Sequence, residues 1–451
     1  MLKISNTIQI WGLNQTQKSS IKNGLTLKNP NFARFKKMGI YAQEYFKYWK
    51  EENNQLVIPR GCWERLVKFY NSNFLPLEFQ SEFVKQEIKN MVWRPNFELR
   101  SAQKEALDKI DYLTWHGIFE MGTGTGKTLL ALEIIRKINL SALILVPNLT
   151  ILKQFKNEAK RFYEIEIGEF SGEKKEIKEI TVATFQSMNA QAINILKEKT
   201  SILIIDEAQI SVAPERQKII MSFNPSYIFG FTGTCEREDG KSKAINFLLG
   251  DILYRFSETP LIPKIKTIYW NKTEEIEIKD TKKDYPKIID RMINCEERNL
   301  MLAELLSDCV NKGQKTLLLT KRIEHYENIK KSLKKIRNFN DRIYFISSKN
   351  KERNELLKEF KNETKHFDAI VGTTSLLSVG LDIPALDTLI IACDMRSGIL
   401  TRQSAGRILR LFGEKKEAEI LDIKDGWNGI LSAQYYKRYK TYKKMGWICK
   451  N

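Results

Sequence analysis

The feature that most constrains the fold of this chain is a glycine-rich turn between a predicted strand and a predicted helix. An apolar run at 117–119 leads into Met-Gly-Thr-Gly-Thr-Gly-Lys-Thr at 121–128, and a helical pattern follows over 129–135. Glycines let backbone N–H groups surround phosphate oxygens, and the helix N-terminus adds the positive end of its dipole. The pattern predicts a phosphate-binding loop, although Met121 stands where the usual pattern has its first glycine. The predicted cradle consists of Gly122, Thr123, Gly124, Thr125, Gly126, Lys127 and Thr128.

Each polar side chain of this loop has an expected task. Lys127 is placed to reach the outer phosphates of a nucleotide, and the Thr128 hydroxyl is placed to ligate Mg²⁺. Downstream, the buried-strand run 201–205 ends in Asp206 and Glu207. Carboxylates at the C-terminal end of a strand lie where α/β sheets bind ligands. We expect Asp206 to hold Mg²⁺ and Glu207 to polarise the attacking water.

Charge and composition limit the class of protein. The chain has 451 residues, 42% of them hydrophobic, and a net charge of +19. This length suits two or three domains, and no apolar run approaches the roughly 20 residues that span a bilayer. Residues 1–50 carry nine Lys or Arg against one acid, Glu44, which is a net +8. Such an excess favours a polyanionic partner. The six scattered cysteines and three unpaired histidines argue against a zinc site and for a reduced, intracellular protein.

Alternating strand and helix patterns predict an α/β fold in three blocks. Residues 1–92 read as a small basic α+β domain, 93–260 as a parallel-sheet domain, and 261–451 as a second one, with the linker near 259–263. The tail from Leu431 onward is basic and rich in tyrosine. Expected strands lie at 118–121, 142–146, 181–184, 202–205 and 228–231, and at 316–320, 343–346, 369–372, 388–392 and 418–422.

The second α/β block lacks a phosphate loop but carries a pair of arginines. Arg407 and Arg410 are three residues apart, so they share one face of a predicted helix. Two forked guanidiniums suit a triphosphate that is approached from across a cleft. A basic helix face that contacts only solvent is the alternative.

The order of these motifs resembles that of the superfamily 2 helicases. The resemblance covers roughly 95–412, and its further pieces are the segments 99–103, 145–155, 183–188, 230–234, 316–320, 371–384 and 403–410. It implies two tandem RecA-like domains that share one ATP, with Arg100 and Gln103 at the adenine, Gly380 and Asp382 in the cleft, and Gln403, Arg407 and Arg410 as the finger motif. It also implies nucleic-acid contacts by Lys153, Gln154, Thr184, Gln186, Lys321, Arg322, Thr373 and Thr374.

Two departures from the commonest motifs of this superfamily indicate which of its subgroups the chain resembles most. The carboxylate motif reads Asp-Glu-Ala-Gln at 206–209, and the finger motif begins with Gln403 where many relatives have His. The chain is therefore more similar to duplex-DNA translocases and to the UvsW-type helicases of tailed phages, whose small leader domain the segments 27–32 and 58–61 also resemble. This likeness implies remodelling of forks, Holliday junctions, R-loops or D-loops by a monomer in the cytoplasm, the host cytoplasm if the chain is phage-encoded.

Two other functions remain open from the sequence. The chain could be the motor subunit of a restriction or defence complex that moves along duplex DNA, or an ATP-gated clamp that remodels RNA–protein complexes. The flanks are also ambiguous. Seven N-terminal aromatics either form a small hydrophobic core or offer rings on which bases stack, and these are Phe32, Phe35, Tyr41, Tyr45, Phe46, Tyr48 and Trp49.

Overall fold

The computed structural model forms two compact units, residues 1–257 and 258–451, and each is described by itself. The structure describes residues 2–111, 114–122, 125–172, 174–237, 239, 241–256, 261–274, 281–336, 342–347, 350, 352–378, 383–396, 398–409, 415 and 417–447. At 281–283, 354, 358, 377, 378, 399, 403 and 407 it describes the backbone only.

The first unit begins with a small sheet and its helices. Five strands pair in the order β5-β6-β2-β1-β7, antiparallel except for β1 with β7. A two-stranded ribbon, β3 with β4, stands apart from this sheet. The elements of this N-terminal block are β1 (Leu2–Ile4), β2 (Thr7–Ile10), α1 (Gln15–Gly24), β3 (Thr26–Lys28), α2 (Phe32–Lys37), β4 (Tyr45–Lys47), β5 (Lys50–Glu52), β6 (Gln55–Pro59), α3 (Trp63–Ser72) and β7 (Phe79–Ser81).

The rest of the first unit is an eight-stranded sheet in the order β11-β10-β12-β9-β13-β14-β8-β15, parallel except for β11. Its strands are β8 (His116–Met121), β9 (Ala142–Val146), β10 (Gly168–Phe170), β11 (Lys175–Glu176), β12 (Ile180–Thr184), β13 (Ile202–Asp206), β14 (Tyr227–Thr232) and β15 (Ile252–Phe256). Its helices are α4 (Ser101–Leu107), α5 (Lys127–Ile138), α6 (Leu149–Tyr163), α7 (Ala190–Leu196), α8 (Pro214–Met221) and α9 (Ser242–Leu249).

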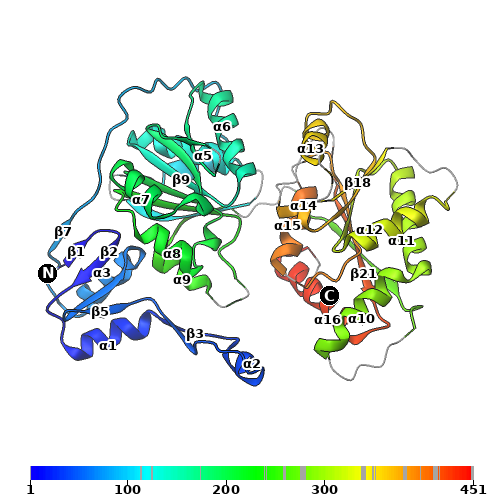
Figure 1. The fold of residues 1–451 in the computed structure, drawn as a ribbon, viewed down its shortest axis with the longest axis horizontal. Coiled ribbons are helices and arrows are strands. Elements are labelled where there is room, and N and C mark those ends of the chain that lie inside the picture. Colours follow the sequence, from blue (N-terminus) through cyan, green and yellow to red (C-terminus); the bar gives the residue numbers. More distant parts are fainter. Residues whose placement is uncertain are drawn as a thin grey trace. The chain divides into compact units, whose positions relative to one another are not determined.

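The central strands are apolar throughout because helices cover both faces of the sheet (Figure 1). In β13, Ile202 and Ile204 pack with α5 and α6, whereas Leu203 and Ile205 pack with α7, α8 and α9. The second of these clusters also contains the core of the N-terminal block. That block is therefore fixed to one face of the parallel sheet and not merely tethered to it.

One buried arginine joins the N-terminal block to the amino-terminal edge of the parallel sheet. The guanidinium of Arg60 donates to the carbonyl oxygens of Trp115, Pro225 and Ser226, which directly precede β8 and β14. Its carbon lies 4.5 Å from the ring centre of Phe83 and 4.4 Å from that of Trp115. Burial lowers the pKa of Arg60 to about 9. This cation holds the edge opposite the glycine-rich loop.

The chain after β7 closes the same edge. Val84 forms a bridge with Pro225, just before β14. Gln86 then hydrogen-bonds Ser201 and Ser141, which lie just before β13 and β9. Strand ends that would otherwise expose backbone groups are thereby satisfied by this segment.

The second unit contains a six-stranded parallel sheet in the order β16-β21-β20-β17-β19-β18. Its strands are β16 (Lys264–Trp270), β17 (Thr316–Thr320), β18 (Ile343–Ile346), β19 (Ala369–Thr373), β20 (Thr388–Ile391) and β21 (Glu419–Asp425). Its helices are α10 (Thr281–Asn294), α11 (Glu296–Asn311), α12 (Ile323–Leu333), α13 (Arg353–Lys361), α14 (Ser375–Ser378), α15 (Gly398–Ile408) and α16 (Gly429–Lys444). Apolar clusters on both faces again leave the sheet fully covered.

The predicted fold class is confirmed: two α/β parallel sheets follow a small α+β block. Every strand expected from the sequence is present, but three parallel strands were missed, namely β10, β15 and β16. β15 and β16 are mixed in polarity because each lies at the end of its sheet and has one neighbour, and β10 is only three residues long. Among the described residues, no helix combines the length and apolar character needed to cross a membrane.

Candidate nucleotide and nucleic-acid site

The glycine-rich loop joins β8 to α5 at the carboxyl edge of the first unit's sheet. Gly126 has φ +81° and caps α5, and a Cβ there would collide with the amide of Gln103. Lys127 Nζ lies 3.1 Å from the carbonyl oxygen of Met121 and donates to it. Thr125 Oγ1 donates to the Gly122 carbonyl oxygen at 2.8 Å. The lysine ammonium thus lies beside the first residues of the loop, at the edge where phosphate is predicted to bind.

The side chain of Gln103 connects the glycine-rich loop to the start of α4. Its Oε1 accepts from the Arg100 N–H at 2.9 Å, and its Nε2 donates to the Gly126 carbonyl oxygen at 3.2 Å. The side chain is buried, so the amide links the start of α4 to the start of α5. Both residues expected at the adenine therefore lie beside the loop, with the Gln103 amide engaged by backbone.

Asp206 ends β13, the strand two places from β8 in the sheet, and Glu207 follows it. Asp206 is buried, and the structure gives it no cation partner among the described side chains. Burial first, and the Glu207 carboxylate second, raise the pKa of Asp206 to about 7, while the Lys127 ammonium opposes the shift. Glu207 has φ +53°, a left-handed conformation that few non-glycine residues adopt. The acids are held together despite mutual repulsion, which is typical of a binding site.

A hydrogen-bond chain runs from these acids to the next strand, β14. Gln209 Nε2 donates to Glu207 Oε2 at 2.5 Å, and Thr232 donates to the other end of the Gln209 amide. Thr232 Oγ1 also accepts from the Thr234 N–H at 3.1 Å. Arg237 donates to the Gln209 carbonyl oxygen. The sequence contained Gln209 and Thr232 within motifs, yet their direct link could not be read from spacing.

The donor set beside the loop suits a hard divalent cation. Mg²⁺ prefers oxygen ligands and uses one or two protein groups together with phosphates. The Asp206 carboxylate and the Thr128 hydroxyl are the oxygens predicted for this task, and Thr128 accepts from Gln154 Nε2 at 3.3 Å. Asp206 suits Mg²⁺ better than Thr128 does. Its carboxylate is buried and forms no ion pair with a side chain of the described chain, so a bound cation would neutralise it.

A hollow of about 510 Å³ opens at the same edge of the sheet, beyond β12 and β10. Thr184 and Gln186 line it, together with Ser187, Asn189 and Lys175. Thr184 Oγ1 lies 2.7 Å from Ser187 Oγ and is buried, whereas Gln186 is exposed. The polar lining and the lysine suit phosphate contacts. Of the two other candidates in this unit, Lys153 is exposed on α6, and Gln154 faces Thr128 and Glu158.

The four candidates in the second unit gather at the carboxyl ends of the neighbouring strands β17 and β19. The Thr374 N–H donates to the Thr320 carbonyl oxygen at 2.8 Å, and Thr373 Oγ1 lies 2.6 Å from Ser375 Oγ. Lys321 and Arg322 follow β17 directly. Each has an acid partner: Lys321 Nζ lies 2.8 Å from Asp394, and Arg322 lies 2.6 Å from Asp290.

Several predicted site residues lie outside the described part of the chain. These are Thr123 and Gly124 in the loop, Gly380 and Asp382 after β19, and Arg410 after α15. Gln403 and Arg407 lie on α15, where only their backbone is described. Their roles stay predictions.

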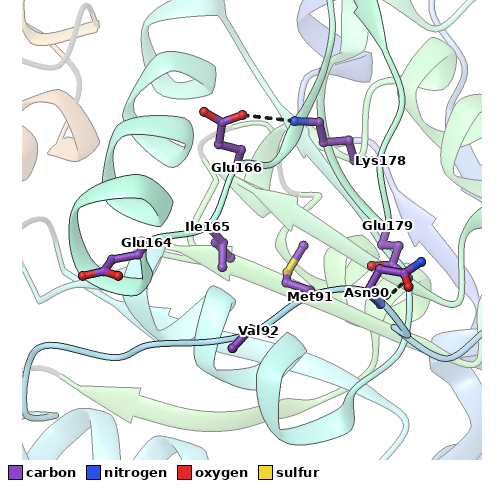
Figure 2. A pocket seen from close by; sticks show the side chains of 8 residues that line it. All are labelled: Asn90, Met91, Val92, Glu164, Ile165, Glu166, Lys178 and Glu179. Atoms are coloured by element: carbon purple, nitrogen blue, oxygen red, sulfur yellow. Dashed lines mark hydrogen bonds and ion pairs between the residues drawn. The ribbon is translucent and has the colours of Figure 1, made fainter.

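A second hollow lies at the opposite, amino-terminal edge of the first sheet and contains none of the predicted site residues. Its volume is about 420 Å³, and its lining is Asn90, Met91, Val92, Glu164, Ile165, Glu166, Lys178 and Glu179 (Figure 2). Glu166 pairs with Lys178 at 3.4 Å, and Glu179 accepts from the Asn90 N–H at 3.4 Å (Figure 2). These acids are engaged in local contacts, and the predicted catalytic acids Asp206 and Glu207 lie at the other edge.

Two protein-family models match the chain. The model described as "Type III restriction enzyme, res subunit" matches residues 96–237, and "Helicase conserved C-terminal domain" matches residues 297–412. Together they span more than half of the chain. The first ends within the hydrogen-bond network beside Asp206, and the second includes the predicted arginine motif.

Known relatives agree with this assignment. The chain is 27% identical over 367 residues to the DNA 3'-5' translocase XPB2 of Sulfurisphaera tokodaii, covering 73% of this chain and 82% of that one. It is 23% identical over 257 residues to the ATP-dependent DNA helicase uvsW of Enterobacteria phage T4, covering 54% and 50%. A fragment of a putative HsdR subunit of a type I restriction enzyme from Vibrio vulnificus shares the fold, with a TM-score of 0.55, 20% identity and coverage of 77% and 68%.

Proposed function

The chain belongs to the superfamily 2 helicases and is similar to UvsW, and we propose that it is an ATP-driven DNA motor that remodels branched duplexes. The observation that carries the motor function is the arrangement of Lys127, Asp206 and Glu207 at one edge of a single sheet. The branched substrate is supported by the net charge of +19 and by the basic N-terminal block.

Each group of the nucleotide site has a chemical task in this proposal. Lys127 and the backbone amides at the start of α5 hold the β- and γ-phosphates. Asp206 and Thr128 would hold Mg²⁺, which would neutralise charge on the phosphates. Glu207 accepts a proton from the attacking water and orients it. Its bond with Gln209, and through it with Thr232, fixes the carboxylate for that role.

The same hydrogen-bond network can couple ATP hydrolysis to movement of the protein. Loss of the γ-phosphate changes the charge that Glu207 faces, and Gln209 relays a shift of this carboxylate to β14 and the segment at 232–237. In the second unit, Gln403 and Arg407 of α15, together with Arg410, are proposed to complete the site and to stabilise charge in the transition state. Gly380 and Asp382 are proposed to contact the nucleotide from the segment after β19.

DNA would be held mainly through its phosphates. Proposed contacts in the first unit are Lys153 and the hollow lined by Thr184 and Gln186. In the second unit they are Lys321, Arg322, Thr373 and Thr374. Such contacts position the strand without reading bases, so sequence preference should be weak. Affinity should fall tenfold or more between about 50 and 200 mM salt, because counterion release drives phosphate binding.

The test is ATP hydrolysis measured with a panel of nucleic acids of equal length. The panel contains single strand, blunt duplex, fork, four-way junction, RNA duplex and RNA–DNA hybrid. We expect the fork and junction to stimulate phosphate release more than blunt duplex, and RNA to stimulate it least. Strongest stimulation by RNA would exclude a DNA motor. Equal stimulation by blunt duplex without displacement of a forked strand would instead fit a restriction-type translocase.

A further inference from the structure

A ribbon projects from the N-terminal block of the first unit and carries a small helix at its end. β3 and β4 pair antiparallel, with Leu27 opposite Phe46, and the chain between them, residues 29–44, contains α2. We name residues 29–44 the ribbon tip. In Figure 1 the ribbon runs out beyond α1 and ends in α2. The ribbon tip is therefore the part of this block farthest from its sheet.

Backbone and amide hydrogen bonds order the ribbon tip. The Asn29 N–H donates to the Glu44 carbonyl oxygen at 2.8 Å, and Asn29 Nδ2 donates to the Gln43 carbonyl oxygen at 2.9 Å. At the end of α2, the Ile40 N–H donates to the Phe35 carbonyl oxygen at 3.0 Å across Gly39, whose φ is +64°. The element is thus shaped by local bonds and not by a hydrophobic core.

The aromatic and aliphatic side chains of the ribbon tip lie outside the hydrophobic core. None of the residues 30–47 is buried. Phe32, Phe35, Met38, Ile40 and Tyr41 belong to neither hydrophobic cluster of this unit. Tyr41 is 91% exposed. The sequence left open whether these aromatics form a core or a contact surface, and the structure answers differently for two groups. Tyr48 is in the core and Phe46 and Trp49 pack against it. In the ribbon tip, by contrast, Tyr41 is exposed, and Phe32 and Phe35 are half-buried outside either cluster.

Charge indicates what would cover this surface. Arg34, Lys36 and Lys37 are exposed and lie on α2, the helix that also carries Phe32 and Phe35, and none of the three cations pairs with a carboxylate within the described chain. Glu44 is the one acid among residues 26–50. Cations beside exposed aromatic rings suit a polyanion whose own rings can stack. A nucleic acid with unpaired bases has both properties, whereas an ordinary protein partner or a second copy of this basic chain lacks the negative charge.

We propose that the ribbon tip binds the branch point of a DNA substrate, with Tyr41 stacked on a base that is unpaired there and Arg34, Lys36 and Lys37 on the flanking phosphates. This inference rests on the proposed function and names the element that recognises the branch. A projecting ring suits a junction better than a continuous strand, because it presents one stacking surface at its end. The shared core and Arg60 fix the ribbon's block to the sheet that carries Lys127, so movement of that sheet moves the ribbon tip.

The experiment compares Tyr41→Ala with Phe74→Ala in the full chain. Phe74 is 96% exposed in the same block but lies outside the ribbon tip, so it controls for loss of an exposed ring. Three quantities are measured: ATP hydrolysis stimulated by blunt duplex, displacement of a forked strand, and fluorescence of 2-aminopurine placed at the branch. Tyr41→Phe tests whether the ring alone suffices.

We expect Tyr41→Ala to slow fork displacement about tenfold and to abolish the binding-induced quenching of 2-aminopurine, since base stacking on one ring has this magnitude. Duplex-stimulated hydrolysis should stay within about twofold of wild type, and Tyr41→Phe and Phe74→Ala should behave as wild type. Wild-type displacement and quenching by Tyr41→Ala would overturn the inference while leaving the motor function intact. If the wild-type chain itself shows no DNA-stimulated hydrolysis, the proposed function fails first. A changed oligomeric state of Tyr41→Ala with normal fork displacement would assign the ribbon tip to self-association and also overturn it.

Discussion

Buried aspartates in the two units have opposite surroundings. Asp422 of β21 is fully buried and accepts three hydrogen bonds from the Arg438 guanidinium, at 3.0, 3.0 and 2.7 Å, and one from the Tyr442 hydroxyl at 2.8 Å. Asp206 of β13 is nearly as buried, but its closest charged neighbour in sequence is another acid, Glu207. Both residues lie in strands that pair with a parallel neighbour on each side.

This difference in surroundings distinguishes a carboxylate that stabilises the fold from one that is available to bind a ligand. Burial alone marks neither role, because both carboxylates are removed from water. A carboxylate with its full set of donors stabilises the fold, and removal of its partner leaves an uncompensated buried charge. A carboxylate whose pKa is raised to about 7 by burial and a neighbouring acid weakens the fold unless a cation binds. The comparison therefore indicates a structural role for Asp422 and supports the proposed role of Asp206 in holding a cation.

The largest expected effect is the loss of ATP hydrolysis when the Lys127 ammonium is removed. Lys127→Ala should lower ATP hydrolysis by about a thousandfold, because the ammonium stabilises charge on the phosphates. DNA binding at low salt and the thermal midpoint should stay near wild type. Lys160→Ala, on the exposed side of α6, is the control and should hydrolyse normally. Parallel loss of hydrolysis and DNA binding in Lys127→Ala would break the assignment of this edge to nucleotide.

The next effect is on the stability of the second unit. Arg438→Met should lower the free energy of unfolding of this unit by about 3–5 kcal/mol, since it leaves Asp422 buried and unpaired. Arg322→Met removes an ion pair whose two side chains are 41% and 54% exposed, and should change stability by less than about 1 kcal/mol. Urea unfolding monitored in both variants is the measurement. Equal losses would show that burial does not distinguish the two pairs.

A smaller effect depends on pH. Burial, together with the Arg298 guanidinium, holds the pKa of His325 well below its usual value. The unfolded chain protonates this histidine below about pH 6.5 and the folded chain does not, so stability should fall as pH falls from 6.5, by at most about 1.4 kcal/mol per pH unit. His325→Gln keeps a polar group beside Arg298 and should remove this slope from unfolding curves between pH 6.5 and 5.5. An unchanged slope would exclude His325 as its source.

The sequence predicted the chemistry-bearing elements better than the connections among them. Parallel sheets, the glycine-rich loop and the two carboxylates follow from local patterns, because glycines, apolar runs and strand-end acids are readable one segment at a time. Strand β16 was missed because an edge strand exposes one side and alternates Lys264, Lys266 and Tyr269 with partly buried residues. Arg60 carries no sequence signal, since its role depends on carbonyl groups more than 50 residues away.

The contacts that side chains of the motifs make could also not be predicted from the spacing of residues in the sequence. The proposed nucleic-acid contact of Gln154 stays a prediction, and the bond that its amide donates to Thr128 at the predicted phosphate loop could not be read from the sequence. Gln209 had no assigned role until its bonds to Glu207 and Thr232 were seen. Such contacts arise from the packing of α6 and β14 against neighbours, which sequence periodicity does not specify.

The most direct measurement pairs hydrolysis with stability in Asp206→Asn and Asp422→Asn. Asparagine keeps the shape of each side chain and removes its charge. We predict that Asp206→Asn loses ATP hydrolysis at least about a hundredfold while unfolding at the same or a higher temperature at pH 8, and that Asp422→Asn unfolds at a lower temperature. An Asp206→Asn chain that hydrolyses ATP normally, or that melts several degrees lower as Asp422→Asn does, would contradict the account.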